Sequence, residues 1–167
     1  DGALGTGPDQ CDERYLLTEL GSSWDDWRPN DWETLPAHRR YFYKSEISRL
    51  IAEDYGDASL FVMKEPRICR LVPVYLDVLN ELGIEIRIIF PFRNPLSVSA
   101  SLEARDDIHP MIGQLLWLRH VLDAEVTTRD LKRTFLDYDD LLSDWRGNLE
   151  RMQAELGLDL WQYAGKD

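Results

Sequence analysis

An arginine and several hydroxyl groups occur at the start of a predicted helix. Arg93 directly follows an apolar segment, and Ser97, Ser101 and Arg105 recur at four-residue intervals on the helix after it. Residues four apart lie on one face of an α-helix. A guanidinium and serine hydroxyls near a helix start are suited to binding a phosphate monoester. The open alternative is that Arg93 pairs with a nearby acid and that the serines only decorate an exposed helix.

Two further side chains are candidates for charge stabilisation and proton transfer. Lys64 ends the short apolar run 59–63, where it could neutralise charge that develops on a transferred group, or could be an ordinary exposed lysine. An attacking hydroxyl needs a base, and His109 is a candidate by position. A lone histidine is more often a surface or packing residue. Other candidates for the base are His38, Glu65, Asp106 and Asp107.

The apolar periodicity of the chain predicts helices that alternate with strands. The predicted helices are 34–56, 71–83, 94–105, 109–127 and 139–157, and Thr34 is the predicted cap of the first. The predicted strands are 59–63, 84–90 and 133–137. This order indicates βαβ units and an α/β fold in three layers, with helices on both faces of a mostly parallel sheet. Such sheets bind ligands beyond the carboxyl ends of their strands.

Length and charge limit the classes of protein to which the chain can belong. Its 167 residues, 44% of them apolar, suit one domain, with residues 1–33 as a loop-and-helix appendage to an α/β core at 34–167. The 19 basic and 31 acidic side chains give a net charge of −12, which disfavours nonspecific binding to nucleic acid or to anionic membranes. An anionic ligand therefore needs a local basic site.

The cysteines and the hydropathy of the chain indicate the expected compartment. Cys11 and Cys69 lie far apart and form neither a metal-type nor a redox-type pair, so we expect no metal and a reducing, cytoplasmic setting. No apolar run has the length of a membrane span, and the acidic start is unlike a signal peptide. We expect neither nucleic acid nor membrane among the partners, and the sequence leaves the oligomeric state open.

A cluster of tryptophans near the start of the chain has two interpretations. Trp24, Trp27 and Trp32 are interleaved with acidic residues. Indoles and carboxylates together could stack on a sugar and hydrogen-bond to it. The alternative is a loop whose indoles pin it to the core.

Four motifs in sequence order resemble the sulfotransferases that use 3'-phosphoadenosine 5'-phosphosulfate (PAPS), in particular bacterial members. Arg93-Asn94-Pro95, with Ser101 eight residues after the arginine, resembles the family's signature for the 3'-phosphate. Lys64–Arg67 resembles the family's Lys-Asp-Pro-Arg element. The other two are Trp117, in the helix after the phosphate signature, and Tyr138–Leu141, which resembles Tyr-Glu-Asp-Leu.

The resemblance implies a P-loop nucleotide-hydrolase-like fold and a reaction. PAPS would be the cosubstrate, and the sulfuryl group would pass to a hydroxyl or amine of a small-molecule or carbohydrate acceptor. Arg93 and Ser101, with Ser97 on the same helix face, would bind the 3'-phosphate. Tyr138 would lie near the adenine as a stacking or base-edge contact, and Lys64 would face the transferred sulfonate.

The sequence departs from the family at the loop that holds the phosphosulfate. No Gly-rich turn of the Lys-Ser-Gly-Thr type follows an apolar strand, and Leu4–Gly7 is not that motif. We therefore expect a strand and a loop before residue 1, and no sulfotransferase activity from the 167 residues alone. The alternative is a noncatalytic nucleotide-binding or protein-interaction domain of the same fold. A related kinase would need a Walker-type loop and a metal-binding acid, which the sequence does not show.

Overall fold

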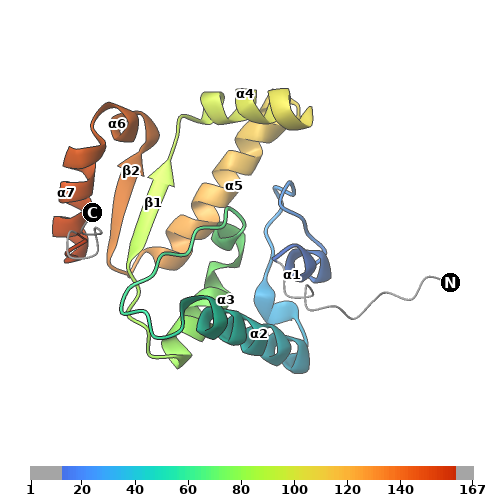
Figure 1. The fold of residues 1–167 in the computed structure, drawn as a ribbon. Coiled ribbons are helices and arrows are strands. Elements are labelled where there is room, and N and C mark those ends of the chain that lie inside the picture. Colours follow the sequence, from blue (N-terminus) through green and yellow to red (C-terminus); the bar gives the residue numbers. More distant parts are fainter. Residues whose placement is uncertain (1–12, 161–167) are drawn as a thin grey trace. The chain divides into compact units, whose positions relative to one another are not determined.

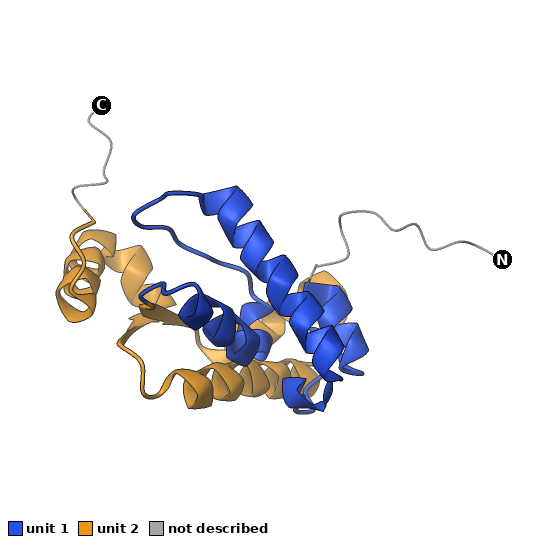
Figure 2. Ribbon diagram, turned by 90° about the horizontal axis from the view of Figure 1, so that it is seen from below, with its two compact units in different colours: residues 1–85 blue, residues 86–167 orange. Residues whose placement is uncertain are grey.

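Most of the chain forms helices, and a small parallel sheet accompanies them in its second half. The computed structural model describes residues 13–160. It is mixed α/β and 62% helical, with a two-stranded sheet. By its internal contacts the chain divides into two compact units, residues 1–85 and 86–167 (Figure 2). None of the helices within residues 13–160 has both the length and the apolar character needed to cross a membrane.

The first unit is helical in its described part. It contains α1 (Glu13–Glu19), the 3-10 helix η2 (Trp32–Thr34), α2 (Ala37–Tyr55) and α3 (Ile68–Glu81). The apolar face of α2 presents Tyr43, Ile47 and Ile51 to α3, where Val74 and Val78 are fully buried. These side chains, with Trp32 and Leu35 from the η2 region and Leu16 and Leu17 from α1, form one hydrophobic core.

The predicted helix 34–56 is confirmed as α2, but Thr34 is not its cap. Thr34 belongs to η2, where its hydroxyl donates a hydrogen bond to the Asp31 carbonyl over 2.6 Å. Pro36 precedes the first turn of α2 and makes no side-chain cap. Pro36 is itself the N-cap, at φ −56° and ψ 145°, and its ring offers no acceptor to the first amides of the helix. Gly56, at φ 48°, ends the helix as predicted.

The strand predicted at residues 59–63 does not form. Phe61 and Met63 pack against the core of the first unit, while Val62 between them is 67% exposed. Phe61 stacks on Tyr55 with their ring centres 4.2 Å apart. The apolar run is therefore used for packing, but a strand also needs a neighbour to which its backbone can bond. The described part of the first unit contains no strand, so this segment has no partner there.

The second unit holds the sheet. It contains β1 (Ile88–Phe92), α4 (Pro95–Asp106), α5 (Pro110–Thr128), β2 (Arg133–Asp137), α6 (Tyr138–Ser143) and α7 (Trp145–Leu156). β1 and β2 are parallel, and their register runs from Ile88 opposite Arg133 to Phe92 opposite Asp137. Figure 1 shows the two strands side by side, with α7 packed along β2. The prediction of parallel strands joined by helices is confirmed for this pair.

The second predicted strand is displaced towards the C-terminus. It was expected at residues 84–90 but spans 88–92. Ile84 instead completes the end of α3: its amide donates to the Leu79 carbonyl over 2.9 Å, and Gly83 takes φ 69°. This is a Schellman motif, which also places an apolar residue against the preceding helix. The strand starts only at Ile88, where pairing with Arg133 begins.

The last predicted helix is two helices. Asp144, at φ −148°, separates α6 from α7, and its carboxylate accepts a hydrogen bond from the Gly147 amide over 2.9 Å. An aspartate that caps a new helix satisfies amides that would otherwise lack a partner. The predicted end at Gly157 is confirmed, with a left-handed conformation at φ 66°.

Candidate functional site

Arg93 and Tyr138 meet at the carboxyl ends of the two strands. Phe92 lies opposite Asp137 in the register, so the next residue of each strand leaves the sheet at the same edge. The Arg93 guanidinium carbon lies 4.7 Å from the centre of the Tyr138 ring. Two of the predicted nucleotide contacts are therefore brought together, at the edge where parallel sheets bind ligands.

The backbone at Arg93 is held by its neighbours. The indole Nε1 of Trp117, on α5, donates a hydrogen bond to the Arg93 carbonyl over 3.0 Å. Asn94 begins α4, because its side-chain oxygen accepts from the Leu96 amide over 2.9 Å. Asp137 does the same for α6 by accepting from the amides of Asp139 and Asp140. The guanidinium therefore projects from a backbone that is fixed by β1, α4 and α5.

The charge of Arg93 is not neutralised within the described residues. Its side chain is half-buried, and neither an ion pair nor a hydrogen bond joins its guanidinium to a described carboxylate. Other arginines of the same unit are paired: Arg105 with Asp106, Arg119 with Asp123 and Arg133 with Glu125. The alternative that Arg93 pairs with a nearby acid is therefore not what the structure shows. Stacking occupies a face of the guanidinium and leaves its edge N–H donors for an anion.

Two of the three serines of α4, Ser97 and Ser101, lie on its exposed side. Ser99 is buried against α5, where Gly113 approaches it closely. Ser97 and Ser101, two positions before and after Ser99, are exposed on the opposite face, as expected for a helix. The structure thus confirms that the two hydroxyls share a face, but within the described residues neither of them hydrogen-bonds to Arg93.

His109 has a structural task in the folded chain. It begins α5, and its Nδ1 accepts a hydrogen bond from the Met111 amide over 3.3 Å. That lone pair is therefore already used, and in the neutral ring Nε2 carries the hydrogen, so His109 can accept a proton only by giving up the cap. The candidate base is thus a helix cap, a role that histidine shares with other acceptor side chains.

Lys64 lies in the first unit, whereas Arg93 and Tyr138 belong to the second. It is exposed, in the segment between α2 and α3 that forms neither helix nor strand. Its neighbour Glu65 accepts hydrogen bonds from the backbone N and Nε of Arg67, at 3.1 and 2.6 Å. These contacts lower the pKa of the Glu65 carboxyl, chiefly through the side-chain hydrogen bond from Arg67. Arg67 therefore ties down its own loop.

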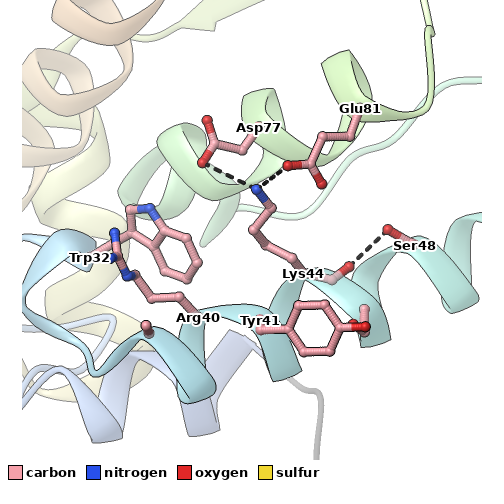
Figure 3. Close-up of a pocket in the computed structure, with 9 residues that line it drawn as sticks. Trp32, Arg40, Tyr41, Lys44, Ser48, Asp77 and Glu81 are labelled. Carbon is pink, nitrogen blue, oxygen red and sulfur yellow. Dashed lines mark hydrogen bonds and ion pairs between the residues drawn. The ribbon is translucent and has the colours of Figure 1, made fainter.

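Sequence reasoning missed a hollow between α2 and α3 of the first unit (Figure 3). Its volume is about 370 Å³, and Trp32, Arg40, Lys44, Asp77 and Glu81 are among its lining residues. The Lys44 ammonium lies 3.7 Å from Asp77 Oδ2 and also pairs with Glu81. No local sequence motif predicts this arrangement. Its charged side chains come from two helices, and only the packing of these helices determines which of them lie close together.

The charges of the hollow are largely matched, so it is not an anion site. Arg40 pairs with Glu33, as Lys44 does with its two carboxylates. Trp32 is only 5% exposed and belongs to the core, as expected for an indole that pins the loop, whereas Trp27 of the same cluster is 47% exposed and does not. Among residues 13–160, the Nε1 of Trp32 and the Nε of Arg40 are buried without a hydrogen-bond partner. This unmatched pair of donors is enclosed by protein.

Within residues 13–160, no group of three or more histidine, cysteine, aspartate or glutamate side chains is arranged to hold a metal ion. No family model, no curated protein and no solved structure matches the chain. The feature with the clearest ligand chemistry is the unneutralised Arg93 guanidinium at the strand ends.

Proposed function

We propose that this chain binds a 3'-phosphorylated adenine nucleotide at the carboxyl ends of β1 and β2, as a sulfotransferase that uses PAPS. The observation that carries the proposal is the stacking of Arg93 on Tyr138, with the guanidinium free of carboxylates among the described residues. The chain has a net charge of −12, so acidic partners are plentiful. A half-buried arginine that pairs with none of the described acids therefore suggests that its charge serves to bind an anionic ligand. A phosphate monoester is a suitable partner for its edge donors.

The same arrangement defines how the nucleotide would be held. The Arg93 guanidinium forms charge-assisted hydrogen bonds to the 3'-phosphate, and the exposed Ser97 and Ser101 hydroxyls add neutral ones. The guanidinium covers one face of the Tyr138 ring. The adenine therefore contacts the other face of that ring or its phenol edge. In this proposal, the two described strands would belong to a larger parallel sheet of the P-loop nucleotide-hydrolase type.

The reaction transfers a sulfuryl group by in-line attack. An acceptor hydroxyl or amine forms a bond to sulfur while the bond from sulfur to the 5'-phosphate oxygen breaks. The acceptor loses a proton to a base, and adenosine 3',5'-bisphosphate leaves with the bonding electron pair. His109 accepts the proton at Nδ1 by releasing its hydrogen bond with the Met111 amide, because Nε2 carries the ring hydrogen while Nδ1 caps α5.

Calorimetric titration with adenosine 3',5'-bisphosphate tests the nucleotide site. We expect Arg93→Ala to weaken binding by about 2 kcal/mol, roughly thirtyfold, because a charged hydrogen-bond donor is lost. Arg146→Ala is the matched control: Arg146 also stacks on an aromatic ring, that of Trp145, at 5.1 Å, and likewise has no acid partner in the described part of the chain. Adenosine 5'-monophosphate should bind the wild-type protein more weakly. Equal affinity for the two nucleotides would refute the assignment.

Transfer of labelled sulfate from PAPS to hydroxyl and amine acceptors tests the chemistry separately. Turnover that depends on Arg93 supports the sulfotransferase. The 167 residues lack the Gly-rich phosphosulfate loop, so we expect binding without turnover from them alone. Arg93-dependent binding without turnover by a chain extended to carry such a loop would instead favour the noncatalytic nucleotide-binding domain. If the protein shows neither binding nor turnover, both the sulfotransferase and the noncatalytic nucleotide-binding domain are excluded.

A further inference from the structure

Helix α5 is apolar on two opposite faces. Gly113, Leu116 and Thr128 are buried on one of them. The other carries an exposed apolar stripe, whose members are between 37 and 65% exposed: Met111, Leu115, Leu118, Leu122 and Val126. Large exposed apolar patches on soluble proteins mark sites of association.

We propose that this stripe is covered by the same stripe of a second copy of the chain, with the two α5 helices antiparallel. The resulting two-fold interface is isologous: if a residue near one end of the stripe contacts a residue near the other end in the second copy, the reverse contact also forms. This interface is independent of the nucleotide site.

The spacing of the stripe favours a second copy over an unrelated partner. The stripe is nearly symmetric about Leu118. Met111 lies seven residues before it and Val126 eight after it, and Leu115 lies three before it and Leu122 four after it. In an antiparallel pair, Met111 therefore faces Val126 of the second copy, and Leu115 faces Leu122. Leu118 meets its own counterpart near the two-fold axis. Sequential steps of four and three residues keep all five side chains on one seam.

The charges beside the stripe are already compensated. Arg119 pairs with Asp123 at 2.8 Å, and Arg129 pairs with Glu125 at 2.6 Å, both along the same helix. A chain of net charge −12 repels its copies over most of its surface. A face whose acids are matched by arginines offers the least repulsion, and the stripe provides the apolar contact.

The size of the stripe sets the expected strength. From Met111 to Val126 it extends over about 22 Å at 1.5 Å per residue. One such seam buries less than the roughly 800 Å² per partner of a standard stable interface. We therefore expect a reversible dimer with a dissociation constant on the order of 10 µM.

Sedimentation equilibrium of the full chain, up to about 100 µM, tests the dimer. The wild type should shift from monomer to dimer over this range. Leu118→Glu should weaken association at least tenfold, because it places two like charges at the axis. Leu142→Glu makes the same change at an exposed leucine of α6, outside the stripe, and should leave association unchanged. A wild type that stays monomeric throughout would overturn the proposal, as would equal weakening by both substitutions.

Cysteine crosslinking tests the antiparallel order independently of affinity. In a background of Cys11→Ser and Cys69→Ser, Leu118→Cys should form a disulfide-linked dimer under mild oxidation. Met111→Cys alone should not, but it should crosslink when mixed with Val126→Cys. A disulfide forms only between residues whose Cα atoms lie within about 7 Å, so these outcomes distinguish antiparallel from parallel packing of the two α5 helices. Self-crosslinking of Met111→Cys as efficient as that of Leu118→Cys would contradict the antiparallel arrangement. Thermal unfolding of each variant verifies that it is folded.

Discussion

The Arg93 guanidinium lies 4.7 Å from the centre of the Tyr138 ring, although the two residues follow different strands. If the ring orients the guanidinium for a phosphate, Tyr138→Leu should weaken binding of adenosine 3',5'-bisphosphate by about 1 kcal/mol, the usual size of an exposed cation–π contact. Tyr138→Phe keeps the ring and should retain that part of the affinity. Calorimetry on both variants distinguishes the ring from the phenol. An equal loss in the two would assign the effect to the hydroxyl instead.

Trp117 should stabilise the end of β1 through its indole. Trp117→Phe removes the 3.0 Å hydrogen bond to the Arg93 carbonyl and leaves that carbonyl without this donor. We expect a loss of about 1 kcal/mol in the free energy of unfolding, measured by chemical denaturation. Trp145→Phe makes the same change at an exposed tryptophan and should cost less. If the two variants are equally stable, the hydrogen bond does not contribute.

Helix positions in the second unit were largely predictable, because their signals are local. Asn94 and His109 each stand before a proline and an apolar repeat, and the helices predicted to begin at these positions form there as α4 and α5. Gly157 ends the last helix for the same kind of reason. Asp144 was missed, since an aspartate inside an apolar repeat is also compatible with one continuous helix.

Strands were less predictable, because a strand depends on a partner distant in sequence. The run 59–63 has strand composition but packs as an unpaired segment, and Ile84 caps α3 instead of starting β1. The contact of Arg93 with Tyr138 follows from the pairing of Phe92 with Asp137, which no local pattern specifies. The sequence predicts both residues as nucleotide contacts, but it does not predict that they touch.

Gly113 should be required for the packing of α4 against α5. A Cβ added at this position would lie 3.0 Å from both Cα and Cβ of Ser99. Glycine to alanine inside a helix usually stabilises by roughly 0.5–1 kcal/mol, whereas overpacking costs about 1–3 kcal/mol. We therefore expect Gly113→Ala to lower the free energy of unfolding, although helix propensity alone would raise it. Gln114→Ala, at the next and exposed position, should change stability by less than about 0.5 kcal/mol. Stabilisation by Gly113→Ala in thermal unfolding would show that the two helices can move apart.

Asp26 should make stability sensitive to acid. Its carboxylate accepts hydrogen bonds from Nε and Nη2 of Arg28, the latter at 2.7 Å, and its carbonyl accepts one from the buried Arg70 at 2.6 Å. The side-chain hydrogen bond from Arg28 is the main cause that lowers the pKa of Asp26 from 3.8 to about 2. The folded protein therefore holds this proton less tightly than the unfolded chain does.

A group with a lowered pKa stabilises the fold above its ordinary pKa, and it loses that contribution as the pH falls towards the lowered value. The contribution of Asp26 should thus be complete above about pH 4 and largely lost near pH 2. Asp26→Asn should reduce the melting temperature at neutral pH and flatten its decline between these pH values. Asp57→Asn, at an exposed aspartate, controls for the loss of one negative charge. If Asp26→Asn and the wild type lose stability in parallel as the solution is acidified, the Asp26–Arg28 contact does not hold the loop in solution.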